Sequence, residues 1–203
     1  MTVALFDPPP SDTPNINISS QDPLQIIQRT IHIMNHPFQG IFCQMQQSLN
    51  GRSANESQEI TITASSIEVG NVNNLTLPTG QDFYTKNALG SWIQFDLKHK
   101  YIIYGYALKS RPYAHDDTAH KSIMRQWSLL GSNTAEENDW KLLDARPPNN
   151  DMLGYLVEKG YVLDKESPPY RYFKLVNDGR NFSTNSYHLL LSQIEFHGYK
   201  VDE

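Results

Sequence analysis

The chain has 203 residues, of which 38% are hydrophobic, and its formal net charge is −5 at pH 7. This composition can bury the core of one large domain, or of one domain with an appendage, and it excludes a wholly disordered chain. Because lysine and arginine are not in excess and no apolar run approaches the ~20 residues of a membrane span, we expect neither a nucleic-acid partner nor membrane insertion.

The first predicted region, residues 1–22, is an extended proline-rich arm, because proline fixes φ and removes a backbone donor. A helix is predicted next, with Asp22 as its N-cap and Pro23 in its first turn. One face of this helix carries a stripe typical of an amphipathic helix that packs on a core, made by Leu24, Ile27, Ile31 and Met34. A strand in which Ile31 and Ile33 alternate is the alternative.

A second short helix is predicted from Phe38 to Ser48, with Ile41, Phe42 and Met45 facing inward. The two helices together make residues 23–57 a helical lead-in segment. Cys43 lies among these apolar residues, so we expect a buried, unreactive thiol rather than a nucleophile.

From residue 58 to 203 the hydrophobic period changes to two, which is typical of strands. Eight short strands are predicted, at residues 60–63, 92–97, 101–109, 126–130, 140–143, 161–163, 170–176 and 189–196. Gly105, in the middle of a strand, indicates a bulge or a close approach of another segment. We expect a mainly β fold, an antiparallel jelly-roll β-sandwich. Because a buried aromatic ring of this size contributes several kcal/mol, core positions are predicted for Trp92, Trp127 and Trp140.

Several ordered blocks carry a resemblance: SWIQFDL at 91–97, WSLLGSN at 127–133, YRYFKL at 170–175 and LSQIEFHG at 191–198. In this order and spacing they resemble the coagulation-factor five/eight type C (discoidin) domain of the galactose-binding-like superfamily. The similarity is nearest to an intracellular branch found in scaffold and ubiquitin-ligase-associated proteins. Secreted members carry a disulfide between the ends of the domain, which a chain with one cysteine cannot form.

The resemblance implies ligand-binding loops at one end of the sandwich, at residues 81–90, 111–122 and 178–187. Sugar recognition uses aromatic faces and planar polar groups, and these loops offer both kinds. The candidate ligand-binding residues are Asp82, Tyr84, Arg111, Tyr113, His115, Arg180, Asn181 and Asn185. Asp82 is the one candidate for a metal, calcium; otherwise no metal or cofactor is expected.

No nucleophile elbow, phosphate loop or metalloprotease spacing is present, so we do not expect an enzyme. The main hypothesis is a non-enzymatic module that binds a protein in a scaffold, cytoskeletal or ubiquitin-ligase-related assembly. The alternative is a lectin-like domain that binds carbohydrate. Because Val3–Phe6 is broken by prolines and the chain has one cysteine, the predicted location is the cytoplasm, including its cytoskeleton.

Overall fold

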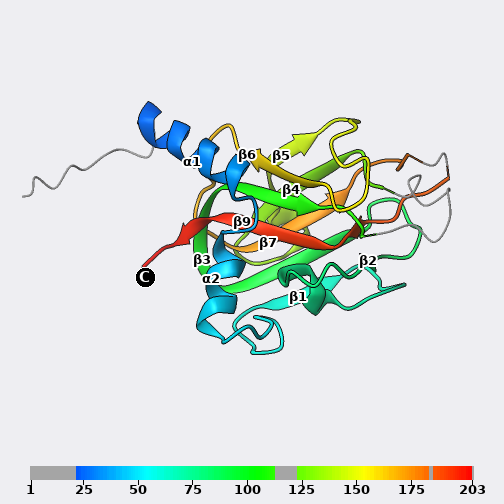
Figure 1. The fold of residues 1–203 in the computed structure, drawn as a ribbon, viewed down its shortest axis with the longest axis horizontal. Helices are drawn as coiled ribbons and strands as arrows, with labels where there is room; N and C mark the ends of the chain where they lie inside the picture. The colour runs from blue at the N-terminus through cyan, green and yellow to red at the C-terminus, as the bar shows by residue number, and fades with distance from the viewer. Residues whose placement is uncertain (1–21, 113–122, 183–184, 203) are drawn as a thin grey trace, which may run out of the picture.

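The computed structural model describes residues 22–112, 123–182 and 185–202. The proline-rich arm up to residue 21, Tyr113 and His115 lie outside these residues. Two helices precede an antiparallel β-sandwich, as predicted (Figure 1). The helices are α1 (Pro23–Asn35) and α2 (Ile41–Ser48), and the 3₁₀ turns are η1 (Val72–Thr76) and η3 (Glu137–Asp139). The strands are β1 (Thr61–Ala64), β2 (Phe83–Tyr84), β3 (Trp92–Lys109), β4 (Trp127–Ser132), β5 (Lys141–Arg146), β6 (Glu158–Val162), β7 (Tyr170–Asn177), β8 (Leu190–Leu191) and β9 (Gln193–Lys200).

Strand β3 belongs to both layers of the sandwich. Its first part, residues 92–96, lies between β1 and β7 in a layer ordered β1-β3-β7-β4-β5. Its second part, residues 101–109, pairs with β9 and β6 in the other layer. The two strands predicted here are therefore one, which turns at Lys98, a residue with φ +63°. The short pair β2-β8 lies toward the end where loops gather (Figure 1).

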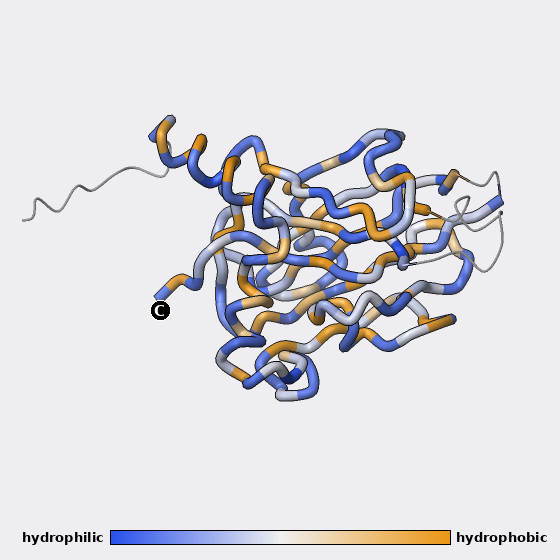
Figure 2. Tube along the Cα trace, in the orientation of Figure 1, coloured by the Kyte–Doolittle hydropathy of each residue, from blue (hydrophilic) through white to orange (hydrophobic). Residues whose placement is uncertain are grey.

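An aromatic cluster fills the space between the layers. Alternate residues of β3, Ile93 and Phe95, point inward and are fully buried, as the period of two predicts. The ring of Phe95 lies 5.5 Å from that of Phe42 and 5.2 Å from that of Phe196. Figure 2 shows the resulting alternation of hydrophobic and hydrophilic residues along the strands. Because Phe42 comes from α2, the lead-in segment contributes to the sandwich core.

A buried carboxylate attaches α2 to β9. Glu195 is 1% exposed and accepts hydrogen bonds from the backbone N–H groups of Phe42 at 2.8 Å and Cys43 at 2.9 Å. Burial raises the pKa of Glu195 to about 7, although these N–H groups oppose the shift. Burial, followed by the charge of Glu195, also raises the pKa of the half-buried Cys43 thiol, which is therefore less nucleophilic.

Helix α1 forms where it was predicted, but it does not bury the predicted face. The Asp22 side chain caps it by accepting from the Leu24 N–H at 2.9 Å. Ile33 is the buried residue of this helix. It packs so closely on Gly105 that a Cβ added to the glycine would lie 2.4 Å from Ile33 Cδ1. The register of β3 against β9 also shifts between Ile103 and Gly105, so the predicted bulge and close approach at this glycine are both confirmed.

The predicted packing stripe of α1 faces solvent, because the side chain that fits over Gly105 is on the other side of the helix. Its members are more than half exposed: Leu24, Ile27, Ile31 and Met34. Within the described part of the chain, neither helix has the length and apolarity needed to cross a bilayer.

Candidate functional site

The described residues of loops 81–90 and 178–187 lie at the end of the sandwich opposite the helices (Figure 1). The two loops are joined there by side chains. Asn87 Nδ2 donates to the Asn185 carbonyl at 2.9 Å, and Asn87 Oδ1 accepts from the Tyr187 N–H at 2.8 Å. The structure therefore brings loops 81–90 and 178–187 together, as the resemblance implied.

Arg111 and Asp82 form an internal ion pair. Arg111 Nη2 lies 2.8 Å from Asp82 Oδ2, and the two side chains are only 8% and 9% exposed. Within the described residues, the remaining buried atoms, Arg111 Nε and Asp82 Oδ1, have no hydrogen-bond partner. Both residues thus hold the loops from inside rather than present a surface to a ligand.

Calcium does not fit at Asp82. The carboxylate faces a guanidinium, and one carboxylate supplies far fewer oxygens than the six to eight that Ca²⁺ takes. Across residues 22–112, 123–182 and 185–202, no group of three His, Cys, Asp or Glu side chains is placed to hold a metal. Asp82 is therefore better explained by its pairing with Arg111.

Asn181 is also internal. It is 2% exposed, its Oδ1 accepts from Asn177 Nδ2 at 3.0 Å, and its Nδ2 donates to the His188 carbonyl at 2.9 Å. Asn177, which the sequence did not single out, donates to the carbonyls of Tyr187 and His188 at 3.0 Å. The two amides shape the loop, so Asn181 is not a surface contact.

The loop-end group, which we define as Arg180, Asn185 and Tyr187, lies at the surface. Arg180 and Asn185 are exposed, and Arg180 Nε donates to the Tyr187 hydroxyl at 2.9 Å. Tyr84 is half-buried, with its ring edge-on to that of His188 at 5.6 Å. Of the predicted contacts, Arg180 and Asn185 are thus the ones that the described structure leaves open to a ligand.

A second candidate surface lies on the outer side of the five-strand layer. Because Ile93 and Phe95 point inward, Trp92 points outward and is only half-buried. Trp140 is half-buried as well, and Lys174 Nζ lies 3.9 Å from the centre of its ring and 5.0 Å from that of Trp92. The predicted core positions of these two tryptophans are therefore wrong, whereas that of Trp127, 0% exposed, is confirmed.

Charged side chains extend this surface along β7. Arg171 binds Asp96 through two hydrogen bonds of 2.7 and 2.9 Å and lies 5.0 Å over the ring of Tyr172. Burial opposes the shift, but hydrogen bonds from Arg171 and Lys98 hold the pKa of Asp96 well below its usual range. Burial lowers the pKa of Lys174. We call this surface the aromatic face: Trp92, Trp140, Arg171, Tyr172 and Lys174.

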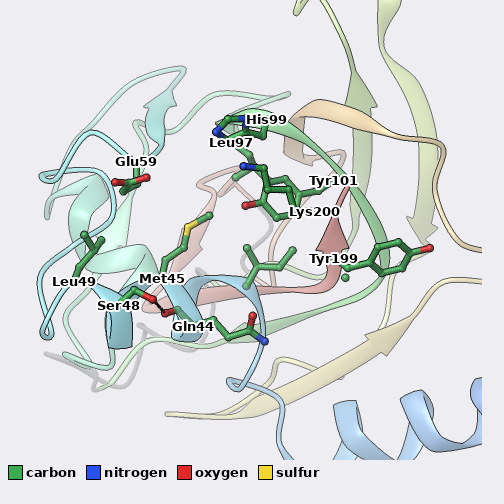
Figure 3. Close-up of a pocket in the computed structure, with 12 residues that line it drawn as sticks. Gln44, Met45, Ser48, Leu49, Glu59, Leu97, His99, Tyr101, Tyr199 and Lys200 are labelled. Carbon is green, nitrogen blue, oxygen red and sulfur yellow. Dashed lines mark hydrogen bonds between the residues drawn. The ribbon is translucent and has the colours of Figure 1, made fainter. Parts of the chain in front are cut away.

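A pocket of about 450 Å³ lies at the helix end, between α2, β3 and β9 (Figure 3). Its floor is apolar, with buried Leu97 and Tyr101, and Met45 reaches into it. Exposed charges, on Glu59 and Lys200, lie on the rim. The pocket therefore offers mainly apolar contact.

No protein-family model matches the chain, and no curated protein sequence does. Among solved structures, a fucolectin from striped bass (Morone saxatilis) serum has a TM-score of 0.56 at 15% identity, over 73% of this chain and 49% of that one. A family 32 carbohydrate-binding module from a Clostridium perfringens family 31 glycoside hydrolase has a TM-score of 0.56 at 11% identity, over 70% and 93%. Another C. perfringens module, solved with GalNAc-β-1,3-galactose, has a TM-score of 0.54 at 13% identity, over 69% and 96%. The chain has the galactose-binding-like β-sandwich fold that its resemblance to discoidin domains implied.

Proposed function

We propose that the chain is a non-enzymatic binding module that docks a protein partner on the aromatic face. The observation that carries this proposal is the pair of half-buried tryptophans, Trp92 and Trp140, both in contact with the Lys174 ammonium. A side chain that belongs to the core is fully buried, whereas each of these two leaves part of a large apolar surface open to solvent.

The composition of the aromatic face is that of a protein interface. Tryptophan, tyrosine and arginine are enriched where proteins meet and supply most of the residues whose truncation costs 2 kcal/mol or more. The face is also rigid before binding, because Asp96 fixes Arg171 with two hydrogen bonds and Lys174 is held against Trp140. A prearranged face loses less conformational entropy on binding.

The solved neighbours support binding rather than catalysis, since they include a lectin and carbohydrate-binding modules. We place the module in the cytoplasm, in a scaffold, cytoskeletal or ubiquitin-ligase-related assembly. This part of the proposal rests on the resemblance to intracellular discoidin domains and on the single cysteine.

The test is a crosslinking experiment in extract of the source cells. A photo-crosslinking amino acid at Gln94, which pairs with Lys174 beside the aromatic face, should capture one protein that the full chain also retains on a column. Trp92→Ala should weaken retention of that protein roughly 30-fold. The matched position is Leu89, exposed at the loop end, where the crosslinker should capture nothing and Leu89→Ala should retain the protein fully. Equal retention by Trp92→Ala and Leu89→Ala would refute the proposal.

A glycan is the second candidate ligand, at the loop-end group. Arg180 and Asn185 are exposed planar polar groups, and Tyr187 adds an aromatic ring, which are the chemical types that bind sugars. Solved neighbours carry GalNAc-β-1,3-galactose and galactose. Saturable binding of the full chain on a glycan array should be lost in Arg180→Ala and kept in Lys86→Ala, and an array without signal would reject this candidate.

A further inference from the structure

The outward side of α1 carries a regular apolar stripe. Leu24 is 68% exposed, Ile27 53%, Ile31 54% and Met34 55%. These residues are three, four and three positions apart, which is the a/d spacing of a coiled-coil seam rather than the wider stripe of a helix that packs on a core. The N-terminal turns of α1 stand clear of the strands (Figure 1), and hydrophobic stretches recur along the helix (Figure 2).

The opposite side of α1 already fixes the helix to the sandwich. Ile33 is fully buried over Gly105 and Gly160 of neighbouring strands. Arg29 stacks over Tyr104 at 4.5 Å and pairs with Glu166. The stripe is therefore not needed to hold α1 in place. Because the 13-residue helix is already formed, a partner that binds the stripe does not have to supply the free energy of helix formation.

We propose that α1 pairs in antiparallel fashion with α1 of a second copy of this chain. A 3-4-3 stripe is complementary to itself, because two such seams interlock when one is reversed. Antiparallel pairing sets Ile27 against Ile31 and Leu24 against Met34. It also places the two sandwiches at opposite ends of the helix pair, since each helix joins its own body through its C-terminal half (Figure 1).

The charges beside the stripe suit a second copy. The side chains that flank the stripe, Gln28, Thr30 and Asn35, are uncharged, so two copies bring no like charges together along the seam. The nearest cation on α1, Arg29, is turned away and paired with Glu166. This pairing is independent of the aromatic face and of the loop-end group.

The size of the stripe makes the dimer weak. Four side chains on one helix supply much less than the ~800 Å² per partner of a standard stable interface. Each copy also has a net charge of −5, so two copies repel each other at low ionic strength. We therefore expect dimers at high concentration, in a population that grows when salt is added.

Sedimentation of the full chain, from roughly 5 µM to roughly 500 µM, tests the proposal. The wild type should shift from monomer to dimer. Ile31→Lys should weaken the dimer at least tenfold, while Leu89→Lys, which also places a lysine at an exposed apolar site but at the loop end, should leave it unchanged. Ile31→Lys and Ile27→Glu copies should each be monomeric and should form a dimer when mixed, because antiparallel pairing sets the lysine against the glutamate.

The outcome that overturns the proposal is a monomer at every concentration, which is what occupancy of the stripe by residues 1–21 or by another protein would give. Equal weakening by Ile31→Lys and Leu89→Lys would overturn it too. Since both side chains are exposed, circular dichroism should show unchanged thermal unfolding; if Ile31→Lys unfolds, Leu24→Lys takes its place in the comparison.

Discussion

Tyr106 joins a buried chain of hydrogen bonds whose removal has a calculable cost. The hydroxyl accepts from Trp127 Nε1 at 2.8 Å and donates to Asp144 at 2.6 Å, and Asp144 also accepts from Arg146 at 2.7 Å. Tyr106 and Trp127 are both 0% exposed, so water cannot replace the lost oxygen. Tyr106→Phe keeps the ring, which stacks on Tyr161 at 5.0 Å, and removes only this atom.

The expected loss is the sum of two terms. An unpaired buried indole N–H costs ~1–3 kcal/mol, and the lost bond to the Asp144 carboxylate adds ~1 kcal/mol, because Arg146 still satisfies that group. The free energy of unfolding should therefore fall by ~2–4 kcal/mol. At ~2–4 °C per kcal/mol for a chain of this size, the Tm should fall by roughly 4–16 °C.

Denaturant unfolding followed by tryptophan fluorescence measures this loss, and Tyr104→Phe is the matched control. Tyr104 lies on the same strand, and its hydroxyl makes no hydrogen bond within the described ranges, so its loss should stay within ~0.5 kcal/mol. In a Trp127→Phe background, which lacks the N–H, Tyr106→Phe should cost ~1–3 kcal/mol less. Equal losses for Tyr106→Phe and Tyr104→Phe would show that the chain of hydrogen bonds does not stabilise the core.

Three further changes test the packing and charge arguments. Gly105→Ala should destabilise the fold by more than 1 kcal/mol, because its Cβ would lie 2.4 Å from Ile33 Cδ1. In chemical denaturation, the double variant with Ile33→Ala should lose less stability than the sum of the two single losses. Asp96→Asn should reduce acid sensitivity, because the lowered pKa of Asp96 gives stability that is present above its ordinary value of 3.8 and is lost as the pH falls below that value. In thermal melts, wild type and variant should differ at pH 7, and the difference should shrink as the pH falls from 3.8 toward 2. A constant difference would contradict the assignment to Arg171. Glu195→Gln places an amide NH₂ against a backbone N–H of α2 and should cost ~1–3 kcal/mol, with faster hydrogen exchange confined at first to α2; exchange rates equal to those of the wild type would show that the carboxylate does not hold that helix.

The body of the fold is predictable from the sequence because the alternation of side chains is local. Ile93 and Phe95 must share a face, and the same alternation in the other predicted strands indicates layers with one buried side. The same alternation already places Trp92 on the other face. The prediction that Trp92 is buried relied on the size of its ring and not on its place in the alternation of the strand. For this reason the aromatic face was not predicted from the sequence.

The loop end was only partly predictable, because residue types do not reveal pairing. Arg111 and Asn181 have the chemistry of ligand contacts, but Asp82 and Asn177 lie close enough to use that chemistry internally. These partners are far away or irregularly placed in the sequence, and only the closed fold brings them together. The prediction of which face of α1 is buried was wrong for a related reason. The site that receives Ile33 is made by two glycines on two strands, Gly105 on β3 and Gly160 on β6.

The continuity of β3 has a consequence for how the molecule opens. Since one strand supplies hydrogen bonds to both layers, we expect the two layers to open together rather than one at a time. Partially unfolded forms with one free layer are thereby suppressed, and with them the exposed strand edges that lead to aggregation. The amide protons of Trp92–Lys109 should then exchange with solvent at rates set by a single cooperative event.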